Sequence, residues 1–205
     1  MLLHCNPDKP NPETIAKAVE ILGSDGIIIY PTDTVYGMGC DMINPRAFER
    51  LCKLTGQVPE KANPSLICHD LSHLSDFTKP ISNHVFRVMK KALPGPYTFI
   101  LPCNNNIPKI FRSNKKTIGI RVPDNSIVRE IVKALGNPIL NMSVHDPGDE
   151  MMEYTTDPEI IHNYYGSKVD LVISGGFGHL AASTVLDCTG EEIVMLRQGL
   201  GEVSW

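Results

Sequence analysis

Side chains that could hold an anion recur along the chain, each at the end of an apolar segment that is predicted to be a strand. An arginine in such a place can clamp a carboxylate or a phosphate through two N–H donors. Singly, each Ser or Thr could be a local backbone cap and each Arg a surface ion pair. Six such strand ends together favour one concave binding site. The side chains are Thr32, Thr34, Ser65, Thr117, Arg121, Asn141, Ser143, Ser183 and Arg197.

No motif for covalent or metal-dependent catalysis accompanies this pattern. The chain has no Gly-x-Ser-x-Gly elbow, no phosphate loop and no His-Glu-x-x-His pair. Gly37-Met38-Gly39 is too short for a dinucleotide fingerprint. The six cysteines show no Cys-x-x-Cys spacing, which argues against a zinc site or a disulfide scaffold. We therefore expect neither a covalent nucleophile nor a bound transition metal.

One segment organises the predicted site. The β-branched run Ile27–Ile29 predicts a strand that is buried on both faces. Pro31 ends this strand because it has no N–H to donate. Polar residues follow directly, at the place where α/β sheets bind ligands. Gly37 and Gly39 are interpreted as positions where the backbone turns sharply or lies close to a ligand.

Helices and further strands are expected on either side of this segment. Asn, Asp or Ser residues, several followed by Pro, mark helix starts near residues 12, 45, 71, 83, 126 and 158. In the fourth helix, Phe86 is expected to face the core with Val85, Met89 and Ala92. Strands are predicted over residues 65–68, 97–101, 117–121, 138–141, 169–174, 183–187 and 193–197, with a polar, acidic surface loop over 146–158. This order predicts an α/β fold with a mixed sheet, in a single domain over residues 1–205.

Composition and charge narrow the class of protein. The chain is 42% hydrophobic and 20% charged, as in soluble globular proteins, and no apolar run approaches a membrane span of ~20 residues. The N-terminus lacks a signal-peptide pattern, so the cytoplasm is the expected compartment. The net charge of −4 conceals a stretch, Phe77–Pro123, with nine basic and no acidic residues. This stretch predicts a positive face for phosphate, nucleotide or RNA, with a solvated face without a partner as the alternative.

The segment Tyr30–Asp41 (YPTDTVYGMGCD) resembles the signature of the YrdC/YciO family, whose best-known members are threonylcarbamoyl-AMP synthases. The likeness continues in Pro94–Leu101 and Thr117–Pro123, and in the segments 170–176, 183–185 and 196–199, so that it extends over almost the whole chain. It is nearest to the YciO-like branch in the segment 66–72 and in the acidic residues after His145.

The resemblance implies a fold, a reaction and ligands. The implied fold is a twisted mixed sheet flanked by helices around a large, concave, positively charged cavity. The implied reaction joins L-threonine, bicarbonate and ATP into threonylcarbamoyl-AMP and pyrophosphate, for the modification of an adenosine beside the tRNA anticodon. Mg²⁺ would accompany the phosphates. Family members are also described as binding double-stranded RNA.

The resemblance also assigns residues to ligands. Those implied for threonine are Thr32, Arg121 and Ser183, and those implied for the nucleotide are Lys53, Lys61, Asn63, Thr117, Asn141, Ser143 and Arg197. The chain departs from the synthase pattern on the nucleotide side, where Thr55 replaces the Arg of a Lys-x-Arg motif and His145 the Asn of a Ser-x-Asn motif. Loss of a guanidinium removes a phosphate contact of ~1.5–3 kcal/mol. His145 could still donate a hydrogen bond to a phosphate.

Three functional hypotheses follow. The first is a nucleotidyltransferase that makes threonylcarbamoyl-AMP, in which positioning and charge neutralisation replace a covalent nucleophile. The alternative is a paralogue without synthase activity that binds tRNA or double-stranded RNA through the cavity and the basic stretch. The third is a related hydrolase or transferase that uses the same threonine pocket.

Overall fold

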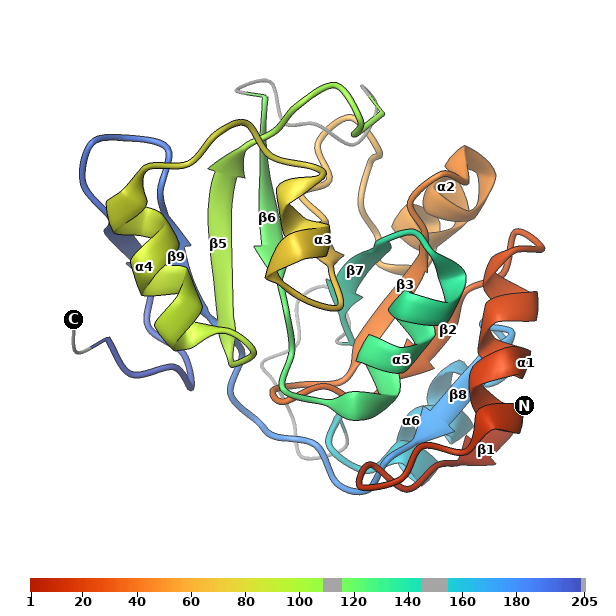
Figure 1. Ribbon diagram of the computed structural model, residues 1–205. Coiled ribbons are helices and arrows are strands. Elements are labelled where there is room, and N and C mark those ends of the chain that lie inside the picture. The colour runs from red at the N-terminus through yellow and green to blue at the C-terminus, as the bar shows by residue number, and fades with distance from the viewer. Residues whose placement is uncertain (109–115, 145–154, 204–205) are drawn as a thin grey trace.

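The computed structural model describes residues 1–108, 116–144 and 155–203. These residues form a ten-stranded mixed sheet flanked by helices, which confirms the predicted α/β fold (Figure 1). Parallel and antiparallel neighbours alternate irregularly across it. In sheet order the strands are β1 (Leu2–His4), β8 (Leu171–Ser174), β2 (Ile28–Tyr30), β3 (Gly37–Asp41), β7 (Ile139–Ser143), β4 (Ser65–Ile67), β6 (Thr117–Arg121), β5 (Tyr97–Pro102), β9 (Thr184–Asp187) and β10 (Val194–Arg197).

Six helices are present in the described part of the chain, and all six begin where the sequence predicts. They are α1 (Pro12–Leu22), α2 (Pro45–Leu54), α3 (Leu71–Ser75), α4 (Asn83–Ala92), α5 (Ser126–Leu135) and α6 (Pro158–Tyr165). Each N-cap side chain accepts a hydrogen bond from the first turn, which stabilises a helix by ~1 kcal/mol. None of these helices is long and apolar enough to span a membrane.

The pleat of the central strands divides the apolar residues between two cores on opposite faces of the sheet. Ile27 and Ile29 pack in one core, and Ile28 and Tyr30 pack in the other, all four fully buried as predicted. Helices α2, α3, α4 and α6 cover the first face, and α1 and α5 cover the second. The second core contains no residue from β6, β5, β9 or β10, so the described helices leave that part of the second face open.

Strand β3 is not among the predicted strands, because its glycines suggest a sharp turn or a close approach to a ligand rather than a strand. A Cβ atom on Gly37 would lie 2.3 Å from Oδ1 of Asn141 and 2.8 Å from the ring of Tyr30. A Cβ atom on Gly39 would lie 2.6 Å from the carbonyl oxygen of Leu140 and 2.9 Å from Oη of Tyr30. The turn interpretation is therefore wrong: within the described structure, these glycines leave room for the Tyr30 side chain to cross a strand.

Other expectations differ in detail from the structure. Phe86 is 41% exposed, and Val88 is buried in its place, because the buried stripe of α4 runs at intervals of three and four residues from Val85. All six cysteines are buried and free, as small core residues. Residues 146–154 of the predicted acidic loop, and His145 before them, lie outside the described residues.

A methyl group at position 39 tests this packing. We expect Gly39→Ala to lower the free energy of unfolding by about 2 kcal/mol or more, because the new Cβ would overlap backbone as well as side-chain atoms. Gly190→Ala is the matched control, since the nearest atom to its Cβ would be 3.9 Å away. Urea unfolding of both variants measures the difference, and equal effects would contradict the packing described.

His73 in α3 predicts a pH dependence of stability. Burial, and then the neighbouring His69 ring at 4.4 Å, lower the pKa of His73, while Asp76 and Asp70 oppose the shift. The unfolded chain therefore binds the proton more tightly than the folded chain does. We expect the free energy of unfolding to fall as the pH drops from about 6.5 through the lowered pKa.

His73→Gln should remove most of this slope in urea titrations between pH 7.5 and pH 5. An unaltered slope in His73→Gln would assign the pH dependence to other groups.

Candidate functional site

The open part of the second face is hollowed into a cavity of about 340 Å³. The strand register places the residues of the cavity floor beside one another. Ser65 lies opposite both Asn141 and Gly119, and Thr98 lies opposite Val185. Residues opposite one another in neighbouring strands point to the same face. The lining residues are Gln57, Ala62, Asn63, Pro64, Ser65, Thr98, Ile100, Thr117, Ile118, Gly119, Arg121, Asn141, Met142, Ser143, Ser183, Val185 and Arg197.

Seven of the ten residues assigned by resemblance lie in this lining. They are Asn63, Thr117, Arg121, Asn141, Ser143, Ser183 and Arg197. Lys53 and Lys61 are exposed and lie outside it, and Thr32 is buried beside it. Thr55 is also buried, and its hydroxyl bonds to the backbone of α2 and to Sδ of Met142. The ligand contacts of all these residues stay predictions.

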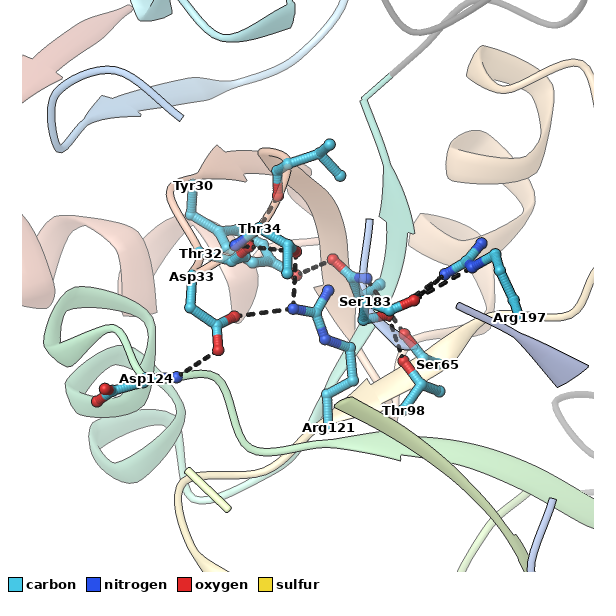
Figure 2. Close-up of polar contacts among 12 residues, drawn as sticks. Tyr30, Thr32, Asp33, Thr34, Ser65, Thr98, Arg121, Asp124, Ser183 and Arg197 are labelled. Atoms are coloured by element: carbon cyan, nitrogen blue, oxygen red, sulfur yellow. Dashed lines mark hydrogen bonds and ion pairs between the residues drawn. The ribbon is translucent and has the colours of Figure 1, made fainter. Parts of the chain in front are cut away.

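A buried ion pair anchors the arginine on the cavity floor. Nη2 of Arg121 donates to Oδ1 of Asp33 at 2.9 Å, and the two side chains are 5% and 10% exposed. The other carboxylate oxygen accepts the backbone N–H of Asp124 at 2.9 Å (Figure 2). Burial lowers the pKa of Arg121, and the charge of Asp33 opposes this shift. The carboxylate therefore neutralises and orients the guanidinium.

Two threonine hydroxyls extend this anchor (Figure 2). Nη2 of Arg121 also donates to Oγ1 of Thr34 at 2.9 Å, and that oxygen lies 3.1 Å from Oγ1 of Thr32. Thr32 donates its only hydroxyl proton to the carbonyl of Val35 and accepts the N–H of Thr34. Thr34 must therefore be the donor in the contact between the two hydroxyls. The Thr32 hydroxyl is fully hydrogen-bonded within the protein, and it supports Arg121.

A β-bulge aims the second arginine at the cavity. Met195 lies opposite Leu186 and Arg197 lies opposite Val185, so Leu196 is an extra residue in β10. In a regular strand without this bulge, Leu196 would lie opposite Val185 and face the cavity. Arg197 would then point to the other face, because side chains alternate along a strand. Nε and Nη2 of Arg197 donate to the carbonyl of Ser183 at 3.1 and 2.9 Å. Burial lowers the pKa of this arginine.

The chemistry of the lining is that of a binding site for an anion. The described lining holds hydroxyls, amides and two guanidiniums, with no carboxylate, imidazole, thiol or amine among its side chains. A Ser or Thr without an adjacent base is not an activated nucleophile. These donors can bind an anionic ligand and neutralise charge that develops on it. The described lining does not fit a resident Mg²⁺ site, which needs carboxylates, so the expected Mg²⁺ would enter only with the phosphates of a substrate.

Sequence reasoning missed three polar residues of this site. Gln57 and Thr98 line the cavity. Thr98 carries a usable signal, because it is the polar residue of an alternating strand and shares a face with Ile100. Tyr30 lies in the signature segment without an assigned role. Asp33 belongs to the polar residues that the sequence places after the organising strand, at the end of the site expected to hold the amino acid, but without a partner. Nothing in the sequence pairs Asp33 with Arg121, a residue 88 positions away.

The basic stretch Phe77–Pro123 does not form one face. Arg121 lies in the cavity on the second face of the sheet. Arg87, Lys90 and Lys91 are exposed on α4, which packs on the first face. The prediction of one positive face is therefore wrong for these described residues, because the sheet separates them. Residues 109–115, which include three further basic residues of the stretch (Lys109, Arg112 and Lys115), lie outside the described residues.

Comparisons with known proteins match this sequence and fold. The family model Sua5/YciO/YrdC, described as telomere recombination, matches residues 20–199. The uncharacterized protein YciO of Escherichia coli K12 is 41% identical over 98% of this chain and 96% of its own length. The crystal structure of E. coli YciO superposes with a TM-score of 0.91 and 39% identity, over 98% of this chain and 97% of that one.

Two more distant relatives carry functional names. The threonylcarbamoyl-AMP synthase of Bacillus subtilis is 32% identical over 92% of this chain, which spans 54% of that protein. The crystal structure of P. abyssi Sua5 complexed with L-threonine has a TM-score of 0.88 and 22% identity. It covers 97% of this chain, which spans 57% of that one, and it supports the fold alone.

Removal of the buried carboxylate tests the anchor. We expect Asp33→Ala to lower the free energy of unfolding by about 3 kcal/mol, because the buried Arg121 charge would lose its counter-ion. Glu20→Ala, which breaks an exposed pair with Lys17, should cost less than about 1 kcal/mol. Thermal or urea unfolding compares the two variants. A small effect of Asp33→Ala would show that Arg121 is neutralised in another way.

Proposed function

The chain belongs to the Sua5/YciO/YrdC family, and from that premise we propose that its cavity binds ATP and L-threonine and, with bicarbonate, forms threonylcarbamoyl-AMP and pyrophosphate. The observation that carries the proposal is the composition of the described lining, with two guanidiniums, hydroxyls and amides and no acidic side chain. The Bacillus subtilis relative, at 32% identity, is named a synthase of this product, in support of the same substrates.

The proposed reaction suits a cavity without a catalytic base. Threonine and bicarbonate form a carbamate, with loss of water. A carbamate oxygen attacks the α-phosphorus of ATP, the bond to the β-phosphate oxygen breaks, and pyrophosphate leaves with the electron pair. The attacking oxygen belongs to the substrate, so the protein needs to hold two anions in line and offset their charge.

The two arginines would divide this task. Arg121 is fixed by Asp33 and Thr34, and it would hold the threonine carboxylate together with Ser183. Arg197, Asn141 and Thr117 would hold the phosphates. Lys53, Lys61, Asn63 and Ser143 stay proposed nucleotide contacts, and Thr32 a proposed threonine contact. The Thr32 hydroxyl would then act on threonine through Arg121, because its hydrogen bonds are already formed with Thr34 and Val35.

RNA binding is the second candidate function, and the exposed basic residues of α4 favour it. Arg87, Lys90 and Lys91 lie on the face of the sheet away from the cavity, so an RNA held there would leave the cavity free. Binding of this kind weakens steeply with salt.

Pyrophosphate release tests the enzyme. We expect release from ATP to require both L-threonine and bicarbonate, with the two substrates also raising each other's effect in a thermal-shift titration. Arg197→Gln should slow release roughly 10- to 100-fold, because a charged hydrogen bond to phosphate is lost. Arg87→Gln is the matched control, since this arginine lies on α4, and its rate should equal that of the wild type.

Equal release with and without threonine would reject the synthase. Salt-sensitive tRNA binding without threonine-dependent pyrophosphate release would favour the RNA-binding alternative. An unchanged rate of release in Arg197→Gln would show that the phosphates do not bind at Arg197.

A further inference from the structure

We propose that Tyr30 is a positioning residue, which fixes the side-chain amide of Asn141 with its NH₂ group toward the cavity and so makes this part of the site select ligand groups that accept hydrogen bonds. The proposal rests on the proposed function for the identity of the ligand. Its geometry stands on one contact: Oη of Tyr30 lies 2.7 Å from Oδ1 of Asn141, in a fully buried position.

The hydroxyl proton of Tyr30 decides which way the amide points. Tyr30 has no exposed surface, and its only hydrogen-bond partner in the described structure is Asn141. With the amide reversed, NH₂ would face the hydroxyl, and the buried proton would have no acceptor. Burial also raises the pKa of Tyr30 far above its usual value, so the hydroxyl stays a donor at neutral pH. The amide oxygen must therefore face Tyr30.

The contact crosses a whole strand. Tyr30 lies on β2 and Asn141 on β7, and β3 runs between them. Tyr30 lies opposite Gly37 and Asn141 lies opposite Gly39, and a Cβ atom at either glycine would overlap one or both partners. Two glycines therefore make the path through which a core residue reaches a cavity residue. The path holds the tyrosine in place from both sides.

The chain of hydrogen bonds runs in the same direction, from donor to acceptor, from Tyr30 through Asn141 into the cavity. Nδ2 of Asn141 donates to Oγ of Ser65 at 3.2 Å. Ser65 accepts this bond, and its own proton has no acceptor among the described residues, so it is available to a ligand. One chain of donors thus runs from Tyr30 through Asn141 and Ser65. A phosphate or carboxylate oxygen completes it, whereas a donor group such as an amine would oppose it.

A double-mutant cycle tests the proposal. We expect Tyr30→Phe to weaken ATP binding roughly tenfold, because the amide of Asn141 is then free to turn its oxygen toward the cavity. In an Asn141→Ala background, Tyr30→Phe should have no further effect on ATP binding, since the tyrosine acts only through the amide. An equal loss in both backgrounds would show a general structural role and overturn the proposal. Tyr97→Phe is the control, because its hydroxyl bonds the backbone of Glu202.

A second measurement does not depend on ATP. The side-chain NH₂ signal of Asn141, identified in an amide NMR spectrum by its loss in Asn141→Asp, should shift in Tyr30→Phe and stay in place in Tyr97→Phe. An unmoved signal would overturn the proposal. If wild-type protein fails to bind ATP while the signal shifts as expected, the proposed function fails and the positioning role of Tyr30 stands.

Discussion

The buried charge of Arg121 is the constraint around which the site is built. A guanidinium with 5% exposure is stable only beside a counter-ion, and Asp33 supplies one from the loop after β2. In sheet order β2 and β6 are four steps apart, and at ~4.8 Å a step a flat sheet would separate them by ~19 Å. The 2.9 Å contact therefore needs the loop after β2 to turn back over the strands that lie between β2 and β6, and the long Arg121 side chain to extend toward it. Cavity, loop and ion pair depend on one another.

Much of the fold could be predicted from local signals. Single residues such as Asn11 and Asp157 predict the helix starts, because their side chains accept a hydrogen bond from the first turn. A run of isoleucines predicts the buried strand β2. Strand β3 could not be predicted, because Gly37 and Gly39 carry no apolar periodicity and their reason lies in Tyr30 of the neighbouring strand. A glycine required by a distant side chain looks, in sequence, like one required by a turn.

The candidate site was predictable in part for the same reason. Ser65, Thr117 and Asn141 interrupt apolar strands, and the pleat places them on one face. The pairing of Asp33 with Arg121 and of Tyr30 with Asn141 depends on the strand order, which no local pattern contains. Resemblance supplied most of the polar side chains of the lining, but it also nominated Lys53 and Lys61, whose side chains lie outside the described cavity. Lys53 lies on α2 and Lys61 on the loop after it, so no strand pairing fixes either residue beside the cavity.

The bulge in β10 has a consequence for how this site can change over time. The extra residue, Leu196, lies on an edge strand whose outer side pairs with no described strand. Loss of the Leu196 codon would remove the bulge and restore regular pairing, and Arg197 would still lie opposite Val185 on the cavity side of the sheet. Every other ladder of the sheet would stay intact. A single deletion at this edge would therefore keep the positive charge of the cavity, whereas a strand that kept all its residues but lost the bulge would turn Leu196 toward the cavity in place of Arg197.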